Sequence, residues 1–502
     1  MTILAHHTDT LTRDALAVLQ PGFEGTTAPS WLLRQVGQGL TAVGLFGRNI
    51  VSAEQLAALT AQLRRERDDL LVAIDEEGGD VTRLEVRGGS SFPGNLALGA
   101  VDDTDLTREV ARELGRRLAE CGVNLNWAPS ADVNSNPDNP VIGVRSFGSD
   151  TRLAARHTAA YVEGLQAAGV AACTKHFPGH GDTNVDSHHA LPRIDVDLDT
   201  LQARELVPFR AAMEAGTKAV MSAHILVPAL DPTRPATLSP QILTGLLRKE
   251  LGYEGLIVTD GMEMNAIAGT YGIERGSVLA IAAGADAICV GGGLADEATV
   301  LGLRDALVDA VREGVLPEER LADAAERVRA LAGWALPQTP SGGTPRARTD
   351  AQPEGSRASG VGLEAARRAL VVTGTPVPVA APYVATLAPV ANIAVGDETP
   401  WGVAAELASL VPGTVSGVYP EGSAAGDVLA AAGDRTVVAV VRDAHRHPWM
   451  TEALDALVAA RPDTVVVEMG VPRAEPRGAL YVATHGASRV CGRAAAEVIA
   501  GV

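Results

Sequence analysis

The sequence predicts an α/β protein: a (β/α)8 barrel of TIM type over residues 1–336, followed by a smaller α/β sandwich domain over residues 360–502. Three observations support this prediction. A length of 502 residues exceeds what one ordinary core accommodates. Short β-branched segments alternate with Ala-, Leu- and Arg-rich stretches of helical period. Residues 337–359 are rich in Pro, Gly and Ser, which is typical of a linker.

Eight apolar segments of the first part are expected to form strands. Each is followed by a stretch of helical period, which is typical of a parallel sheet with helical crossovers. The expected strands are Leu16–Leu19, Val43–Phe46, Leu70–Asp75, Asn124–Trp127, Ala171–His176, Ala219–Ser222, Leu256–Asp260 and Ala287–Val290. Eight such units favour a closed barrel over an open doubly wound sheet.

Polar side chains collect where these strands end. In a barrel, the carboxyl ends of all strands lie on one face, where catalytic residues are found. The residues that end or directly follow an expected strand are Asp75, Asp132, Lys175, His176, Ser222, His224 and Asp260. The sequence therefore predicts a site at this face of the barrel.

The C-terminal part repeats the alternation of strands and helices without a dense cluster of ionisable groups. Strands are expected near residues 369, 391, 436, 464 and 480. The pattern indicates a largely parallel sheet covered by helices. Two roles for this domain stay open, covering the site or forming a homodimer.

Composition excludes several classes of partner. The net charge of −19 argues against nucleic acid and against anionic membrane surfaces, because both attract clustered Lys and Arg. No apolar run reaches the length of a membrane span, and His6, His7 and Asp9 interrupt the stretch that a signal peptide needs. We therefore expect a cytoplasmic protein.

The four cysteines are widely spaced. None forms a CxxC pair or a Cys/His ligand pattern, so the sequence suggests neither a zinc site nor a disulfide framework. Buried free thiols are the expected state, which suits a reducing compartment. The residues are Cys121, Cys173, Cys289 and Cys491.

The most informative segment follows the fifth expected strand and reads KHFPGHGDTNVDSHHALP, from Lys175 to Pro192. Imidazole and carboxylate groups are common metal ligands, so a metal site is one interpretation, and a solvated loop is another. The segment lacks the helical HExxH spacing, and loops at this end of a barrel carry function. We interpret it as a catalytic loop that holds no metal.

This segment resembles the catalytic loop of family 3 glycoside hydrolases, in particular their bacterial β-N-acetylglucosaminidases. The resemblance covers about residues 15–335. It implies that His188 is the general acid/base and Asp186 its partner, and that Lys175 and His176 bind sugar hydroxyls. A carboxylate beside a histidine stabilises the imidazolium, which can then donate a proton to the leaving oxygen.

The resemblance extends to the segment YEGLIVTDGMEM. There it implies that Asp260, at the end of a strand, is the nucleophile. An alternative from the residues alone is that Asp260 caps the helix that follows.

Two further segments carry the resemblance. In LLVAIDEEGGDVTRLE it implies that Asp75 and Arg83 bind substrate, and in NPVIGVRSFGSD that Arg145 contacts the sugar. A structural ion pair is the alternative for Arg145. Many relatives have Arg where this chain has Asp80, which affects the expected subsite preference but not the reaction class.

These assignments imply a retaining exo-β-N-acetylglucosaminidase that needs no cofactor. It would release terminal N-acetylglucosamine from small soluble glycosides, either chitooligosaccharides or muropeptides, through a glycosyl–Asp260 intermediate. A neutral histidine base would not repel phosphate, so a phosphorylase that uses phosphate in place of water is an alternative. A catalytically silent sugar-binding protein is a third, because fold does not imply function.

Overall fold

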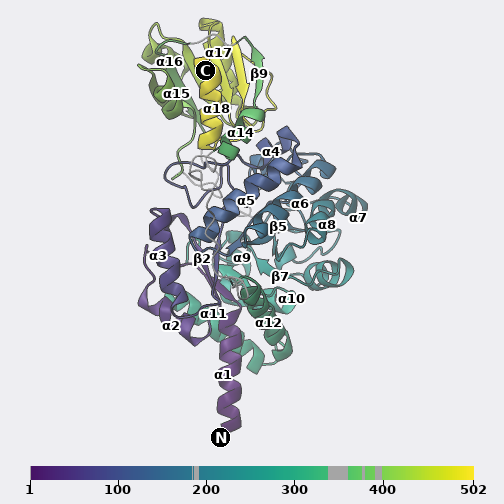
Figure 1. Cartoon of the computed structure of the whole chain (residues 1–502). Helices are drawn as coiled ribbons and strands as arrows, with labels where there is room; N and C mark the ends of the chain where they lie inside the picture. Colours follow the sequence, from purple (N-terminus) through teal and green to yellow (C-terminus); the bar gives the residue numbers. More distant parts are fainter. Residues whose placement is uncertain (1, 184, 186–190, 337–359, 376–378, 390–397) are drawn as a thin grey trace.

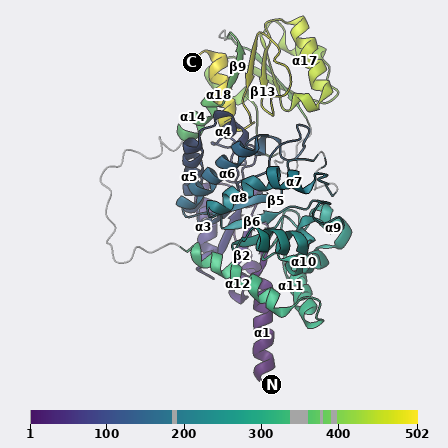
Figure 2. The ribbon, with the colours of Figure 1, turned by 90° about the vertical axis from the view of Figure 1, so that its right-hand side faces the viewer.

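The computed structural model describes residues 2–183, 185, 191–336, 360–375, 379–389 and 398–502, with the backbone alone for residues 2–9. Two α/β domains follow each other along the chain (Figure 1). The C-terminal domain lies over one end of the N-terminal domain, and helix α1 extends from the opposite end (Figures 1 and 2). The predicted linker, residues 337–359, lies outside the described residues.

The N-terminal domain contains eight parallel strands arranged in a ring. Strands β2 to β7 form one sheet in sequence order, and β8 pairs in parallel with β1. The Thr259 amide donates to the Ala287 carbonyl (3.0 Å) and so joins β7 to the segment entering β8. The strands are β1 (Leu19–Pro21), β2 (Ala42–Leu45), β3 (Leu71–Ile74), β4 (Leu125–Asn126), β5 (Ala171–Phe177), β6 (Ala219–Ser222), β7 (Leu256–Thr259) and β8 (Ile288–Val290). The predicted barrel is confirmed.

Two strand predictions need correction. Leu16 and Ala17 belong to helix α1, because the Val18 amide still donates to the Asp14 carbonyl, and the strand begins only at Leu19. Asn124 lies outside β4, although its backbone amide donates to the Val72 carbonyl (3.1 Å) and its carbonyl accepts from the Ala171 amide (2.9 Å); its side chain adds two further bonds. Its amide oxygen accepts from the Val72 amide (2.7 Å), and its amide nitrogen donates to the Leu70 carbonyl (3.1 Å).

Helices surround the ring of strands (Figure 2). Several begin at the Ser or Asp residues that cap helices well, such as Ser52, Asp103, Asp150 and Asp296. The α-helices are α1 (Thr2–Ala17), α2 (Ser30–Gln38), α3 (Ala53–Arg64), α4 (Asn95–Val101), α5 (Thr104–Glu120), α6 (Thr151–Ala167), α7 (Leu198–Thr200), α8 (Leu206–Glu214), α9 (Asn265–Tyr271), α10 (Ile273–Ala283), α11 (Glu297–Arg312) and α12 (Glu318–Trp334). Two segments are π-helical, η3 (Leu201–Glu205) and η5 (Gln241–Glu250).

Alternation along the strands divides the core of this domain in two. In β3, Leu71 and Ala73 point into the ring, whereas Val72 and Ile74 pack against the outer helices. The interior is filled mainly by small and medium side chains, and Val328 and Leu331 of α12 join it. The ring is therefore packed inside, and its free space lies at the carboxyl ends of the strands.

The C-terminal domain is a six-stranded sheet between two layers of helices. The strand order is β11-β10-β12-β13-β14-β9, and only the β9–β14 pair is antiparallel. The strands are β9 (Val371–Gly374), β10 (Tyr383–Ala388), β11 (Val415–Pro420), β12 (Val437–Val441), β13 (Val465–Glu468) and β14 (Leu480–Ala483). The largely parallel sheet is as predicted, but β10 and β11 were not foreseen. The strand expected near residue 391 lies outside the described residues.

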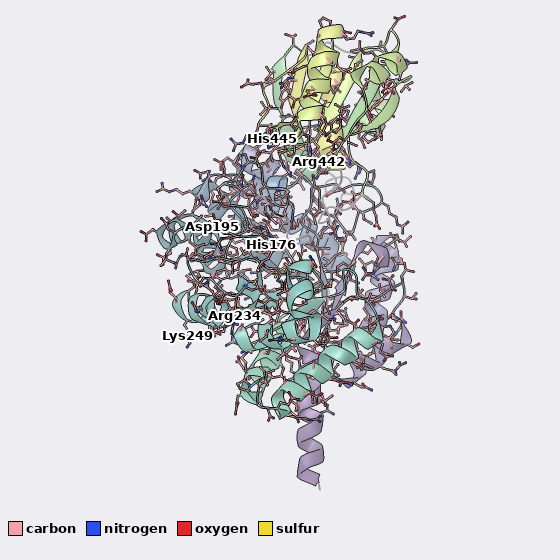
Figure 3. All side chains as sticks on the ribbon, turned by 180° about the vertical axis from the view of Figure 1, so that it is seen from behind. His176, Asp195, Arg234, Lys249, Arg442 and His445 are labelled. Carbon is pink, nitrogen blue, oxygen red and sulfur yellow. The ribbon has the colours of Figure 1, made fainter. Side chains whose placement is uncertain are left out.

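Helices cover both faces of this sheet. Helices α14 (Gly360–Arg368), α15 (Ala404–Leu410) and α18 (Arg489–Ala500) pack on one face, and α16 (Ala425–Ala432) and α17 (Pro448–Ala460) pack on the other. Arg442 and His445, which follow β12, lie on the side of the domain that faces the barrel (Figure 3). In the part of the chain that the structure describes, no helix combines the length and apolarity that membrane crossing requires. All four cysteines are free and buried, as predicted.

Candidate active site

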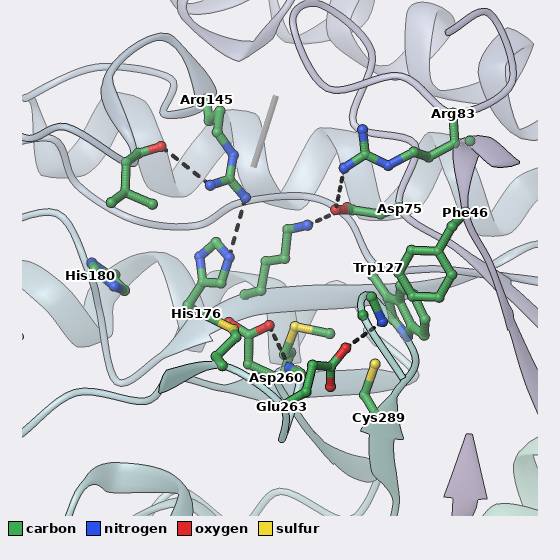
Figure 4. Close-up of a pocket in the computed structure, with 18 of the residues that line it drawn as sticks. Phe46, Asp75, Arg83, Trp127, Arg145, His176, His180, Asp260, Glu263 and Cys289 are labelled. Atoms are coloured by element: carbon green, nitrogen blue, oxygen red, sulfur yellow. Dashed lines mark hydrogen bonds and ion pairs between the residues drawn. The ribbon is translucent and has the colours of Figure 1, made fainter. Parts of the chain in front are cut away.

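A cavity of about 660 Å³ opens at the carboxyl ends of the barrel strands (Figure 4). Six of the predicted site residues line it, and they come from β5 and from the segments that follow β3, β4 and β7. These residues are Asp75, Arg83, Arg145, Lys175, His176 and Asp260. The other two, Asp186 and His188, lie outside the described residues.

Lys175 is at the centre of the buried charges. Strand β5 extends to Phe177, so Lys175 is still part of the strand and its side chain lies inside the ring. Only 2% of this side chain is exposed. The Lys175 Nζ donates to Asp75 Oδ1 (2.5 Å) and also pairs with Glu77 Oε1 (2.7 Å). Burial lowers the pKa of Lys175, but the two carboxylates outweigh it and raise the pKa overall. Lys175 is therefore a fixed ammonium donor at the edge of the cavity.

Arg145 forms a two-pronged ion pair with Glu77. Its Nε and Nη2 donate to the two carboxylate oxygens at 3.0 and 2.7 Å, and both side chains are buried. Burial raises the pKa of Glu77, yet Arg145 and Lys175 outweigh it and hold the pKa well below its usual range. Arg145 is thus both a structural ion-pair partner and a residue that lines the cavity.

Sequence reasoning missed the role of Glu77. Adjacent residues of an extended segment point to opposite faces, so Glu76 and Glu77 cannot act as a catalytic pair, and neither was assigned a role. The same alternation places Glu77 on the side of Asp75, and this signal could have identified Glu77 as the anion that orders Lys175 and Arg145.

Glu76 instead faces away from the cavity and organises the loop that carries Arg83. Its Oε2 accepts from the backbone amides of Arg83 and Leu84, both at 2.7 Å. Burial raises the pKa of Glu76 to about 7 despite these bonds. The Arg83 guanidinium then lies 3.7 Å from Asp75, so two of the predicted substrate contacts form one cluster.

His176 is oriented by a buried carboxylate. Its Nδ1 lies 2.7 Å from Asp132 Oδ2, and Arg145 Nη2 lies 3.3 Å from its Nε2. Since Arg145 can only donate, the network assigns the proton of His176 to Nδ1 and leaves Nε2 as acceptor. Burial raises the pKa of Asp132, but His176 outweighs it and keeps the carboxyl ionised.

Asp260 directly follows β7. Its amide donates to the Ser222 carbonyl (3.1 Å), and its Oδ1 accepts from the Gly261 amide (2.8 Å). The next helix, α9, begins only at Asn265, so Asp260 is not its cap and that alternative is wrong. Strand pairing therefore presents this carboxylate to the cavity that His176 also lines (Figure 4), and Lys175 belongs to the same lining.

Residues that the sequence did not indicate complete the wall. Phe46, Trp127, Met221 and Cys289 supply apolar and aromatic surface, which suits one face of a sugar ring. Glu263 accepts from the backbone amides of Gly291 and Gly292 and so fixes the loop after β8. Glu398 reaches the cavity from the C-terminal domain. Each of these positions depends on tertiary packing.

The base of the predicted catalytic loop is held by Arg204. This guanidinium donates to Glu205 Oε1 and to Asp182 Oδ2, both at 2.6 Å. Gly179, with φ of +126°, packs so closely on Glu205 that a Cβ there would lie 2.7 Å from the carboxylate. Burial raises the pKa of Glu205 to about 7.

We expect Glu205→Gln to remove part of the pH dependence of stability. A carboxyl whose pKa is raised on folding destabilises the protein as pH rises from the unfolded pKa, about 4.3, towards 7. The variant therefore gains stability relative to wild type by on the order of 2 kcal/mol between pH 5 and 8. Urea unfolding at both pH values measures this. If the free energies of unfolding of variant and wild type differed by the same amount at both pH values, the raised pKa of Glu205 would be contradicted.

The arrangement suits binding and cleavage of a glycoside. The cavity is lined by guanidinium, ammonium and imidazole groups and by the Asp75 carboxylate. Such groups can form hydrogen bonds with the hydroxyls of a sugar ring. The lining also includes the Asp260 carboxylate, which can attack an electrophilic carbon. Aromatic surface completes the cavity.

Comparison with known proteins agrees with this geometry. The family described as "Glycosyl hydrolase family 3 N terminal domain" matches residues 27–331. The chain is 38% identical over 312 residues to a beta-hexosaminidase A of Pseudoalteromonas piscicida, covering 57% of this chain and 52% of that protein. It thus spans about half the length of that relative. A beta-hexosaminidase of Neisseria gonorrhoeae (strain ATCC 700825 / FA 1090) is 36% identical over 265 residues, covering 51% of this chain and 73% of the relative.

Among solved structures, a glycoside hydrolase family 3 beta-N-acetylglucosaminidase from Paenibacillus sp. strain FPU-7 superposes with a TM-score of 0.85. It is 34% identical, and the match covers 98% of this chain and 96% of that one, so both domains are shared. The chain therefore belongs to glycosyl hydrolase family 3 and is a glycoside hydrolase.

Proposed function

We propose that the protein is a retaining exo-β-N-acetylglucosaminidase acting on small soluble glycosides. The observation that carries this proposal is the position of Asp260, which directly follows β7 and lines the same cavity as Asp75, Arg83, Lys175 and His176. Relatives named beta-hexosaminidase and beta-N-acetylglucosaminidase support the choice of sugar.

In the first step Asp260 attacks the anomeric carbon, and the bond from that carbon to the leaving oxygen breaks. His188, as the imidazolium paired with Asp186, gives its proton to the leaving oxygen. The product is an α-linked glycosyl–Asp260 ester and a free alcohol. Lys175, His176 and Asp75 hold the ring hydroxyls, so that the anomeric carbon stays opposite the nucleophile.

In the second step water attacks the same carbon from the opposite face. Neutral His188 takes a proton from this water, and the bond to Asp260 breaks. The sugar leaves with its β configuration, and both residues return to their starting protonation states. Two inversions at one carbon account for retention.

An exo mode fits the shape of the cavity. The cavity of about 660 Å³ opens at the carboxyl ends of the strands, and the ring beneath it is filled by packed side chains, so a terminal sugar that enters from this end meets a closed floor. The lining of the cavity also includes Arg48, Val86 and Glu398. Chitooligosaccharides and muropeptides both carry the terminal sugar that this site would accept.

The test compares nitrophenol release from the aryl β-N-acetylglucosaminide and the aryl β-glucoside. We expect kcat/KM for the N-acetyl substrate to be at least about ten-fold higher, because an acetamido group supplies contacts that a hydroxyl lacks. NMR of the sugar formed in the first minutes is expected to show the β anomer. Equal rates on both substrates, an α product, or sugar 1-phosphate formed in phosphate buffer would each overturn the proposal.

A further inference from the structure

The C-terminal domain contacts the barrel at the loop that carries substrate-binding residues. This loop, here called the β3 loop, comprises residues 75–92 and includes Asp75, Glu77 and Arg83. Two separate stretches of the β3 loop are bound by the C-terminal domain, one at Asp80 and one at Gly89 and Ser90. Arg83 lies between them.

Asp80 makes the first attachment. Its Oδ2 pairs with the Arg442 guanidinium, which follows β12, and its Oδ1 accepts from the Ala487 amide (2.7 Å), just before α18. The Asp80 side chain is 1% exposed and that of Arg442 is 13% exposed. Removing the partner of a carboxylate this deeply buried greatly lowers the free energy of unfolding, because it leaves an uncompensated charge in the interior. An exposed ion pair contributes far less to the free energy of unfolding.

The second attachment is made by α18. The Val490 amide donates to the Ser90 carbonyl (3.4 Å), and the Arg489 Nε donates to the Gly89 carbonyl (3.3 Å). Gly89 has φ of +78°, and a Cβ there would lie 3.1 to 3.2 Å from Arg489 and Pro400, so the backbone approaches the domain closely. Both ends of the segment around Arg83 are therefore held from outside the barrel.

On the barrel side, the same segment is held by Glu76, which accepts from the Arg83 and Leu84 amides. The Glu76 backbone is in turn bonded to the Asn126 side chain of β4, so the β3 loop is attached both to the barrel and to the C-terminal domain. Arg442 also stacks over Trp401 at 5.9 Å, and Trp401 stands three residues after Glu398, which lines the cavity. The Arg442 guanidinium therefore contacts the β3 loop at Asp80 and also the segment of the C-terminal domain that carries Trp401 and Glu398.

We propose that the C-terminal domain braces the substrate-binding loop, and that Asp80 is the positioning residue through which it holds Arg83 in place. The proposal gives this domain a role in sugar binding without a catalytic residue of its own. The expected change in KM rests on the proposed function, whereas the expected change in hydrogen exchange of the β3 loop does not. Arg442 completes the brace from the domain side.

The experiment compares three single variants of the full chain. Asp80→Asn and Arg442→Met remove the charge pair from either side, and Arg442→Lys keeps the positive charge. Arg368→Met is the matched control, because Arg368 forms an interdomain ion pair with Asp103 (2.9 Å) that does not touch the β3 loop. Kinetics on the aryl β-N-acetylglucosaminide are combined with hydrogen exchange of residues 82–91.

We expect Asp80→Asn and Arg442→Met to raise KM about ten-fold with kcat changed less than about three-fold, because a misplaced sugar contact weakens ground-state and transition-state binding alike. Amides of residues 82–91 exchange faster in both variants. Arg442→Lys stays closer to wild type than Arg442→Met in both measurements, and Arg368→Met is unchanged in both.

Unchanged KM together with unchanged exchange in Asp80→Asn and Arg442→Met would overturn the brace. So would an equal effect of Arg368→Met, since that result would mean that any loosening of the interface suffices. If Asp80→Asn unfolds, Arg442→Met decides, because it leaves the bond from Asp80 to Ala487 in place. Failure of the proposed function is recognised separately, as a folded wild type that is inactive on the aryl substrate; hydrogen exchange then still decides on the brace.

Discussion

Asp260→Ala is expected to lower kcat on the aryl β-N-acetylglucosaminide by about 10⁴-fold or more, with the fold retained. Loss of a nucleophile removes the covalent route, and the remaining groups only bind and orient the substrate. The carboxylate accepts from the Gly261 amide at the edge of the cavity, so its removal leaves no buried charge without a partner in the core. Initial rates and circular dichroism measure the two parts of this prediction.

Azide provides the discriminating control. In Asp260→Ala the small anion fits the space of the lost side chain, attacks the anomeric carbon and displaces the nitrophenolate, giving an α-glycosyl azide. Asp138→Ala is the matched variant, since Asp138 is an exposed carboxylate in the loop after β4 that does not line the cavity. Wild-type activity in Asp260→Ala, or comparable loss in Asp138→Ala, would remove Asp260 from the nucleophile role.

Lys175→Met is expected to lower both activity and stability. The change leaves Asp75 and Glu77 without their shared cation inside the ring, and breaking a buried pair from one side costs about 3–5 kcal/mol. The estimate belongs at the lower end, because Glu77 keeps Arg145 and Asp75 is partly exposed. Urea unfolding and kcat/KM measure the two effects.

The stability effect of Lys175→Met has a predictable pH dependence. The pKa of Glu77 is depressed on folding, so its contribution is present above the unfolded pKa of about 4.3 and is lost as pH falls further. The difference in the free energy of unfolding between wild type and Lys175→Met is therefore smaller at pH 3.5 than at pH 7. Lys249→Met, at an exposed lysine on the outer surface (Figure 3), is the control and is expected to change stability by less than about 0.5 kcal/mol. A pH-independent difference would contradict the coupling of Lys175 to Glu77.

Interior packing explains why the sequence predicted which segments form strands more accurately than the residues at which those strands begin and end. Continuous apolar runs identified the eight strand segments, because both faces of a barrel strand are buried, one inside the ring and the other against the helices. They could not identify the end of α1 at Ala17, where helix and strand are equally buried. Nor could they show that the Asn124 side chain bonds the Val72 amide and the Leu70 carbonyl beside β4.

By itself, the sequence determined the fold class, the face of the barrel that carries the site, and six cavity residues including Asp260 and Lys175. The succession of apolar segments and the polar residues at their ends are local features of the sequence, and a parallel barrel brings such ends together by its geometry. Only the tertiary structure decided that Glu77 orders Lys175 and Arg145, and that Asp80 binds Arg442 across the domain interface. These pairs join residues 68 to 362 positions apart, and which charges meet at such separations depends on how whole elements pack.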